Sequence, residues 1–138
     1  MFKIVLFIKD FELGSKVSAA CVDAGYPVEF SDENTDPSLF NSENLIVFVD
    51  LDEKVFASVG LVSELKRREL KVVGIMKKIK NKERLKLQSA GCDIIFPRSS
   101  IVRNISKLIK EGFSDGEVLT WMAWDSETDQ IMSNIEIN

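Results

Sequence analysis

The sequence predicts an α/β fold, a three-layer αβα sandwich with a five-stranded parallel sheet in (βα)5 order and a C-terminal extension. Two observations lead to this prediction. Short runs of branched and aromatic apolar residues alternate along the chain with segments in which apolar residues recur at helical spacing. Repeated strand-helix-strand units make crossover connections, which place the strands parallel in one sheet and cover both of its faces with helices.

The first part of the chain contains three of the predicted strands. Residues 3–8 (KIVLFI) and 44–50 (NLIVFVD) are nearly continuous apolar runs, as is typical of strands buried on both faces of a sheet. Residues 12–24 carry small and apolar side chains on one stripe, which predicts an amphipathic helix that a following glycine ends. A short strand at 27–31 (PVEFS) and a weak helix at 37–43 complete this part.

The second part continues the same alternation. A helix over 54–69 precedes the strand 71–76 (KVVGIM), whose residues are nearly all apolar. A polar helix over 81–90 and a strand over 92–96 (CDIIF) follow, and a helix over 99–111 closes the domain. Glycine stands directly after each of the last two helices, where it is a common stop signal.

The composition is that of an ordinary globular protein. The chain has 138 residues, 45% of them hydrophobic and 29% charged, which suits one domain with a substantial core. We expect residues 1–112 to form this domain and residues 113–138 to form an acidic tail. The tail holds six of the 22 acidic residues and no Lys or Arg, so the domain alone has a net charge of +2.

Charge, hydropathy and residue usage exclude several classes of function. A net charge of −4 gives no electrostatic reason to expect nucleic acid or an anionic membrane as partner. No segment approaches the roughly 20 apolar residues of a membrane span, and the N-terminus lacks a signal-peptide pattern, which predicts a cytoplasmic protein. The chain has no histidine, the usual general base, and Cys21 and Cys92 lack metal-ligand spacing. We therefore expect two core thiols and no enzyme.

An acidic residue ends the third predicted strand, in the stretch 45-LIVFVDLDEK-54. Asp50 directly follows five apolar residues, and Asp52 and Glu53 come close behind it. We expect these two to be loop acids that favour the N-terminus of the next helix. In open parallel sheets, ligands bind beyond the carboxyl ends of the strands. Those ends lie here at Lys9-Asp10, Asp50, Met76-Lys77 and Pro97-Arg98.

The order of the elements and the position of Asp50 resemble the receiver domains of two-component response regulators, over residues 1–112. In that family, the aspartate that ends the third strand accepts a phosphoryl group from a histidine kinase. Two acids at the end of the first strand hold Mg²⁺, a Thr or Ser ends the fourth strand, and a Lys ends the fifth. These groups neutralise and hold the charge that gathers on an aspartyl phosphate.

Asp50-Leu51 fits the family pattern, but the rest of the expected site departs from it. Ile8 and Lys9 stand where the acid pair belongs, and a shift of one residue recovers only Asp10. The hydroxyl position falls on Met76, or on its lysine neighbour in the sequence. The metal ligands and the hydroxyl group that aspartyl phosphorylation requires are therefore incomplete in this chain.

The fifth strand and its loop, 91-GCDIIFPRSS-100, resemble the family segment that carries the lysine. Arg98 falls at the lysine position, and Pro97 comes before it rather than after it. The bond between Phe96 and Pro97 is a candidate for the cis geometry that the family places after its lysine. We expect Asp50 to stay ionised in a charge-assisted pair with Lys9 and Arg98, which takes over the neutralising role of Mg²⁺.

The resemblance implies a stand-alone atypical receiver, or pseudoreceiver, that signals by binding a protein partner or a second copy of itself. No cofactor is expected, and Mg²⁺ only if Asp50 is a working phosphoacceptor. One alternative is a conventional phosphorelay receiver phosphorylated on Asp50. Another is a homodimeric adaptor that acts through the tail. A nucleotide-binding domain is a weaker candidate, because no G-x-G-x-x-G follows the first strand.

Two segments are candidates for the contact with a partner. Receiver domains commonly present their output surface on residues equivalent to 81–111 here. The basic stretch 77–86 is then either a solvated helix face or a docking surface for acidic partners. The tail docks either on its own domain or on a partner. The candidate contact residues are Lys82, Arg84, Lys86, Arg103 and Lys107, with Trp121 and Trp124 in the tail.

Overall fold

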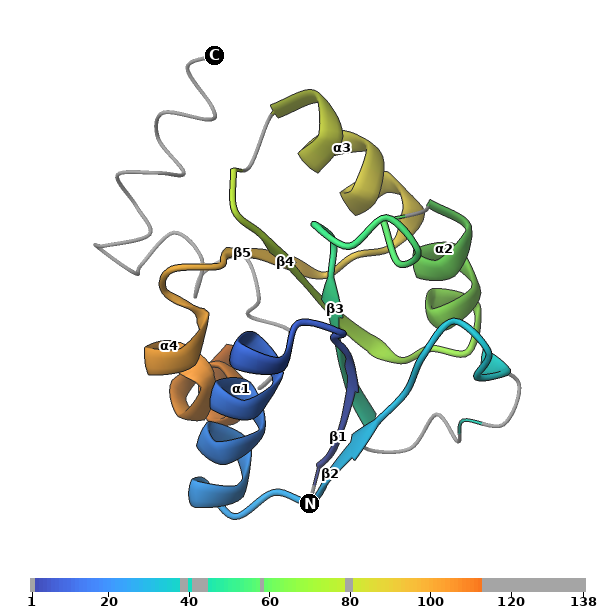
Figure 1. Cartoon of the computed structure of the whole chain (residues 1–138). Coiled ribbons are helices and arrows are strands. Elements are labelled where there is room, and N and C mark those ends of the chain that lie inside the picture. The colour runs from blue at the N-terminus through green and yellow to red at the C-terminus, as the bar shows by residue number, and fades with distance from the viewer. Residues whose placement is uncertain (1, 38–39, 41–44, 58, 79–80, 113–138) are drawn as a thin grey trace.

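Five parallel strands form one sheet in the computed structural model, which describes residues 2–37, 40, 45–57, 59–78 and 81–112 (Figure 1). The strand order is β2-β1-β3-β4-β5. The strands are β1 (Lys3–Phe7), β2 (Val28–Phe30), β3 (Leu45–Asp50), β4 (Lys71–Met76) and β5 (Ile94–Pro97). The helices are α1 (Phe11–Asp23), α2 (Val59–Arg67), α3 (Asn81–Ala90) and α4 (Ile101–Lys107), which continues into the π-helical turn η2 (Leu108–Gly112). The predicted fold class is confirmed, and most of the weak helix expected at 37–43 falls outside the described residues.

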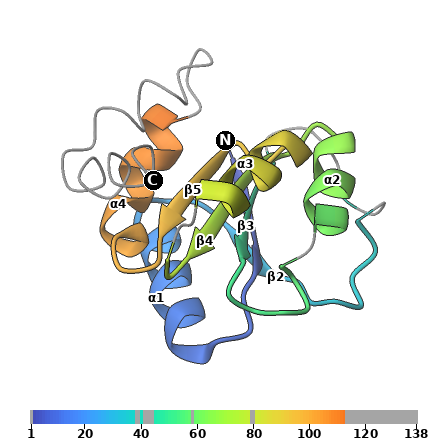
Figure 2. The ribbon, with the colours of Figure 1, turned by 90° about the horizontal axis from the view of Figure 1, so that it is seen from above.

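Helices cover both faces of the sheet. The view from above shows α1 and α4 on one face and α2 and α3 on the other (Figure 2). Nearly all side chains of β1, β3, β4 and β5 are buried between these layers, because a strand covered on both faces exposes neither row of side chains. None of the helices in the described part of the chain is long and apolar enough to cross a membrane.

The register of the sheet brings three strand ends to one edge. Asp50 at the end of β3 pairs with Ile75 of β4, and Met76 at the end of β4 pairs with Pro97 of β5. The backbone N–H of Arg98 then donates to the carbonyl of Met76 (2.9 Å). Because all strands of a parallel sheet point the same way, residues far apart in the sequence meet at this edge.

The bounds of β4 and α3 agree with the predicted ones, whereas α2 begins at Val59 rather than at residue 54. The chain before it is held in turns, in which the N–H of Phe56 donates to the carbonyl of Glu53 (3.0 Å). The Phe56 ring is fully buried and packs edge-on against Phe7, with 5.5 Å between the ring centroids. Burying such a ring contributes about 2 kcal/mol, which anchors the loop after β3 to the core.

Candidate functional site

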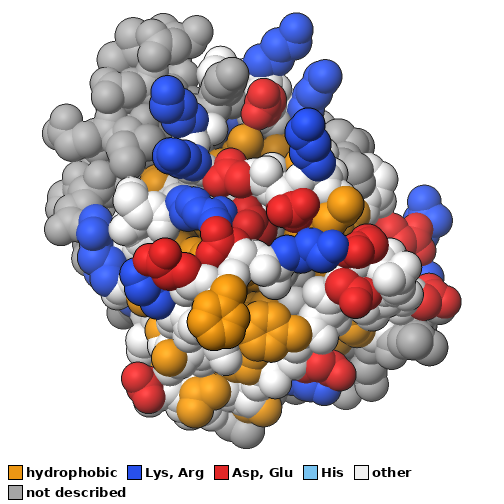
Figure 3. Space-filling view, in the orientation of Figure 1, with side chains coloured by type: hydrophobic (Ala, Val, Ile, Leu, Met, Phe, Trp, Pro, Cys, Tyr) orange, Lys and Arg blue, Asp and Glu red, His pale blue; other side chains and the backbone are white. Residues whose placement is uncertain are grey.

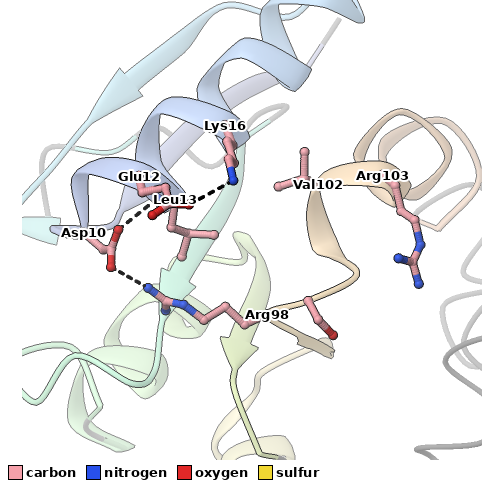
Figure 4. A pocket seen from close by; sticks show the side chains of 8 residues that line it. Asp10, Glu12, Leu13, Lys16, Arg98, Val102 and Arg103 are labelled. Atoms are coloured by element: carbon pink, nitrogen blue, oxygen red, sulfur yellow. Dashed lines mark hydrogen bonds and ion pairs between the residues drawn. The ribbon is translucent and has the colours of Figure 1, made fainter.

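Arg98 stands at the centre of a cluster of acidic side chains at the carboxyl edge of the sheet. Its Nη1 donates to Oδ1 of Asp50 (2.9 Å), and its Nη2 donates to Oδ2 of Asp10 (3.0 Å). The same Nη1 lies 3.4 Å from Oδ2 of Asp52. Figure 4 shows the Arg98 side chain reaching from the β5–α4 loop to Asp10 at the start of α1. We call these four residues the Arg98 cluster.

Asp50 is the buried member of the Arg98 cluster. Only 3% of its side chain is exposed, because β3 is the central strand and its end is covered by the loops around it. Its Oδ1 accepts hydrogen bonds from Arg98 and from the backbone N–H of Asp52 (3.1 Å). A buried carboxylate is costly unless it is paired and hydrogen-bonded, and here both conditions are met. The expected ion pair between Asp50 and Arg98 is thus confirmed.

Asp10 connects the Arg98 cluster to the first helix. It is the N-cap of α1, and its Oδ1 accepts from the backbone N–H of Leu13 (2.9 Å) while its Oδ2 faces Arg98. The hydrogen bond from Leu13, together with the nearby positive charge of Arg98, lowers the pKa of Asp10 below its usual value. Asp10 is therefore held as a carboxylate by two kinds of partner.

Asp52 connects the Arg98 cluster to the loop after β4. Its Oδ2 accepts from the backbone N–H of Lys77 (2.8 Å) as well as facing Arg98. The expectation that Asp52 acts as an acid at a helix N-terminus is wrong, because α2 begins only at Val59. The sequence did contain a clue to this position. Asp52 is two residues after Asp50, and in a turn such a residue can face the same side of the sheet edge as Asp50.

Arg98 keeps its charge in this environment. Partial burial disfavours the protonated form, but the hydrogen bond to Asp50 and the charges of Asp50, Asp10 and Asp52 outweigh it. The pKa of Arg98 is consequently raised above its already high value. The guanidinium is a permanent cation that joins the ends of β1, β3 and β5.

Lys9 does not take part in the cluster, so its expected pairing with Asp50 is wrong. Its Nζ lies 2.7 Å from Oε1 of Glu33, in the turn that follows β2. Ile8 is buried, whereas Lys9 lies beyond the end of β1 and is exposed to solvent. Hydrogen bonding to Glu33 raises the pKa of Lys9, although this pair is exposed to solvent.

The ends of β4 and β5 depart from the receiver pattern as the sequence predicts, apart from one peptide bond. Met76 is buried at the end of β4 and presents a thioether where the family has a hydroxyl. No peptide bond among the described residues is cis, so the bond between Phe96 and Pro97 is trans and the cis expectation is wrong. Pro97 ends β5, an edge strand, where the missing N–H of proline is tolerated.

Next to the Arg98 cluster, a pocket of about 510 Å³ lies between α1 and the start of α4 (Figure 4). Arg98 and Asp10 form one wall, and Lys16, which pairs with Glu12 (3.0 Å), lies on α1. Arg103 of α4 also lines the pocket, and Figure 4 shows its guanidinium pointing away from Asp10. Both signs of charge line this pocket, which gives no preference for an anion or a cation.

Mg²⁺ does not fit the Arg98 cluster. This ion requires carboxylate and other oxygens in nearly octahedral geometry. The carboxylates of Asp10, Asp50 and Asp52 all face the guanidinium of Arg98, whose charge stands where the charge of an ion would have to be. Across the described ranges, no group of three or more acidic or cysteine side chains could hold a metal ion.

The predicted partner-binding residues lie on two helices of opposite layers. Lys82 and Lys86 are exposed on α3, and Arg103 and Lys107 lie on α4. Arg84 is less suitable than expected, because it is partly buried and donates to Asn81 (2.8 Å) and Gln88 (3.3 Å) on its own helix. Trp121 and Trp124, with the rest of 113–138, lie outside the described residues.

Comparisons with known proteins support the fold. No protein-family model matches the sequence, and no curated protein is significantly similar to it. Among solved structures, a two-component response regulator from Clostridium difficile has a TM-score of 0.64 at 10% identity, covering 83% of this chain and all (100%) of that one. The chemotaxis protein CheY4 from Vibrio cholerae has a TM-score of 0.61 at 14% identity, with 78% and 98% covered.

A third solved structure, from Burkholderia pseudomallei, is of a protein named for an inferred relation to pilus assembly. It has a TM-score of 0.62 at 16% identity, covering 80% of this chain and 87% of that one. At these identities the three likenesses concern the fold alone. The resemblance to receiver domains is confirmed at that level, in the CheY-like arrangement of one parallel sheet between helices.

Proposed function

We propose that this chain is an atypical receiver, or pseudoreceiver, which acts in signal transduction through protein–protein contacts and without Mg²⁺-dependent phosphorylation of Asp50. The observation that carries the proposal is the Arg98 cluster. A single guanidinium lies 2.9 Å, 3.0 Å and 3.4 Å from carboxylate oxygens of Asp50, Asp10 and Asp52. The cluster supports neither a metal ion nor a free phosphoacceptor.

The state of Asp50 argues against phosphoryl transfer to it. A phosphoacceptor needs an accessible carboxylate oxygen, a metal to neutralise the incoming phosphoryl group, and a donor to hold that group in line. Asp50 is 2% exposed, and its Oδ1 already accepts two hydrogen bonds. Met76 supplies no hydroxyl. A phosphoryl group on Asp50 would also bring negative charge next to Asp10 and Asp52, with one arginine to balance all of it.

The same geometry suggests a domain held in one state. Arg98 joins the β5–α4 loop to the loop after β3, through Asp50 and Asp52, and to the start of α1, through Asp10. Phosphorylation in the receiver family changes the charge at this edge, whereas a permanent guanidinium keeps it constant. We expect the chain to present a constant surface to a protein partner or a second copy, with no cofactor and no catalytic activity of its own.

Phosphorylation assays test the chemical part of the proposal. The chain would be incubated with acetyl phosphate and Mg²⁺, and its intact mass measured, with a conventional receiver domain treated in parallel as positive control. Beryllofluoride and Mg²⁺ would be added in a separate thermal-unfolding assay. We expect no added phosphoryl mass and no change in melting temperature. Labelling that disappears in Asp50→Asn would show instead a conventional phosphorelay receiver.

Affinity capture tests the signalling part. Wild type and Asp50→Asn, each checked for native circular dichroism, would be used as bait under identical conditions. If Asp50 has no regulatory chemistry, both baits should retain the same proteins. A partner that is gained or lost with the change at Asp50, while the fold is intact, would contradict the proposal of a constant binding surface.

A further inference from the structure

An apolar groove lies beside the Arg98 cluster, between the loop after β3 and α3. It has a volume of about 300 Å³, and its apolar lining consists of Leu51, Ala57, Met76 and Leu87. Leu51, Met76 and Leu87 belong to the buried core, and Ala57 is exposed. A groove of this size and lining fits one large aromatic side chain, which gains most when its apolar face leaves water.

One lysine, Lys86, lines this groove, and three more are close along the chain to its lining residues Met76 and Glu83. Lys77, Lys78, Lys82 and Lys86 are all exposed, and none of them forms an ion pair with another described residue. Figure 3 shows Lys and Arg side chains projecting over the region of α3. Glu83 also lines the groove, and Oδ2 of Asp52 accepts from the backbone N–H of Lys77 (2.8 Å), so two acids oppose the charge of the four lysines. The border of the groove is therefore basic.

Several cations elsewhere on the described surface have a carboxylate partner, whereas Lys54 has no ion pair with another described residue and Lys71 lies over the ring of Phe2. Lys3, Lys9, Lys16 and Lys66 each pair with a nearby carboxylate at 2.7–3.1 Å. Two arginines of α2 share Glu64 in the same way. The contrast indicates that the lysines of the stretch 77–86 are complementary to negative charge supplied from outside the described residues.

We infer that this groove is the docking site of the chain's own acidic segment, residues 113–138, with a tryptophan in the groove and carboxylates beside the lysines. The segment contains six acids, no Lys or Arg, and both tryptophans of the chain, Trp121 and Trp124. Asp125 and Glu127 follow Trp124 closely, so one short stretch carries the aromatic anchor and the charge. Both features match the groove and its border.

The length of the segment allows this contact within one molecule. It starts directly after η2, which follows α4 on the face of the sheet opposite to α3. Trp121 is nine residues beyond Gly112, and nine extended residues span about 30 Å. Adjacent packed layers are separated by about 10 Å, so helices on opposite faces of a sheet are about 20 Å apart, and the segment can pass the edge at β5 and reach α3. A tethered segment also has an effective concentration in the millimolar range.

Tryptophan fluorescence tests the inference on the full chain, because both tryptophans lie in 113–138 and none lies in 1–112. For the wild type we expect blue-shifted emission and weak quenching by acrylamide. Lys82→Glu combined with Lys86→Glu should shift the emission to the red and strengthen quenching, since each reversal lowers the docked-to-free ratio by up to about fivefold. The control is Lys16→Glu, which makes the same charge change per residue on the opposite face of the sheet. It should leave the emission and the quenching unchanged.

A second variant addresses the groove itself without changing charge. Ala57→Phe places a ring in the groove from an exposed position, so the domain should fold normally and the emission should shift to the red. Red, strongly quenched emission of the wild type would overturn the inference. So would blue emission that neither change affects, as expected if the segment docks on the apolar patch of Phe11, Val22 and Phe30.

The oligomeric state separates docking within one molecule from exchange between two. We expect a monomer in light scattering, with emission that is independent of protein concentration. Emission that turns blue only as a dimer forms would overturn docking within one molecule and identify a second copy as the occupant. Docking does not depend on the chemistry at Asp50, so the phosphorylation assay and the fluorescence assay can fail separately.

Discussion

Replacing Arg98 with alanine leaves the buried carboxylate of Asp50 without its cation. The two groups are 2.9 Å apart, and 3% of the Asp50 side chain and 23% of the Arg98 side chain are exposed. At about 4 Å between charge centres and an effective dielectric constant of about 20, their attraction is about 4 kcal/mol. Breaking buried pairs costs about 3–5 kcal/mol, and the partial exposure of Arg98 favours the lower end. We therefore expect Arg98→Ala to lower the free energy of unfolding by about 3 kcal/mol.

Urea denaturation followed by far-ultraviolet circular dichroism measures this loss, with the slope checked for constancy. Arg98→Lys keeps the charge but not the planar fork, so it should lose less than alanine does. Lys9→Ala removes an exposed pair instead and should cost less than about 1 kcal/mol. A loss below about 1 kcal/mol in Arg98→Ala would refute the reasoning, because it would mean that Asp50 is not stabilised by the guanidinium.

Arg98→Ala has a second expected consequence. It leaves the carboxylates of Asp10, Asp50 and Asp52 facing a space that a cation occupied. We expect sodium chloride at about 0.5 M, which screens the repulsion among these carboxylates, to raise the melting temperature of this variant more than that of the wild type. Equal responses of both proteins would contradict the role assigned to Arg98.

Three further predictions concern other parts of the domain. Burial raises the pKa of Cys21 and Cys92 to about 12. About one such thiol in ten thousand is then ionised at pH 8, so Ellman's reagent should label both cysteines in urea but neither in the native protein. Gly74→Ala puts a Cβ 2.5 Å from Cδ1 of the buried Leu51, and urea midpoints should show a loss of about 2 kcal/mol; an unchanged midpoint would refute this. A backbone hydrogen bond in the first turn of α1 lowers the pKa of Asp10 below 3.8, so its stabilisation is present above that value and is lost as the pH falls through the folded pKa. Thermal unfolding should accordingly show Asp10→Ala to be less stable than wild type at neutral pH, with a difference that shrinks in acid.

Much of the fold could be predicted because its signals are local. The apolar runs that became β1, β3 and β4 mark strands buried on both faces wherever they occur. Gly25 and Gly91 end their helices with φ of 92° and 118°, a conformation that disfavours any side chain with a Cβ. The start of α2 could not be predicted in this way, because the helical spacing after β3 extends over turns whose Phe56 contacts Phe7, a residue far away in the sequence.

The candidate site shows the same division more sharply. The sequence by itself determined that Asp50 ends the third strand and that the metal ligands and hydroxyl of a receiver are incomplete around it. Only the tertiary structure decided which charges meet, because Arg98 is 48, 46 and 88 positions from Asp50, Asp52 and Asp10. Lys9 lies beyond the end of β1 and pairs with Glu33 in the turn after β2, and the turn after β3 brings in Asp52. Ion pairs depend on distances in space, which strand register and loop burial set and which residue order alone does not.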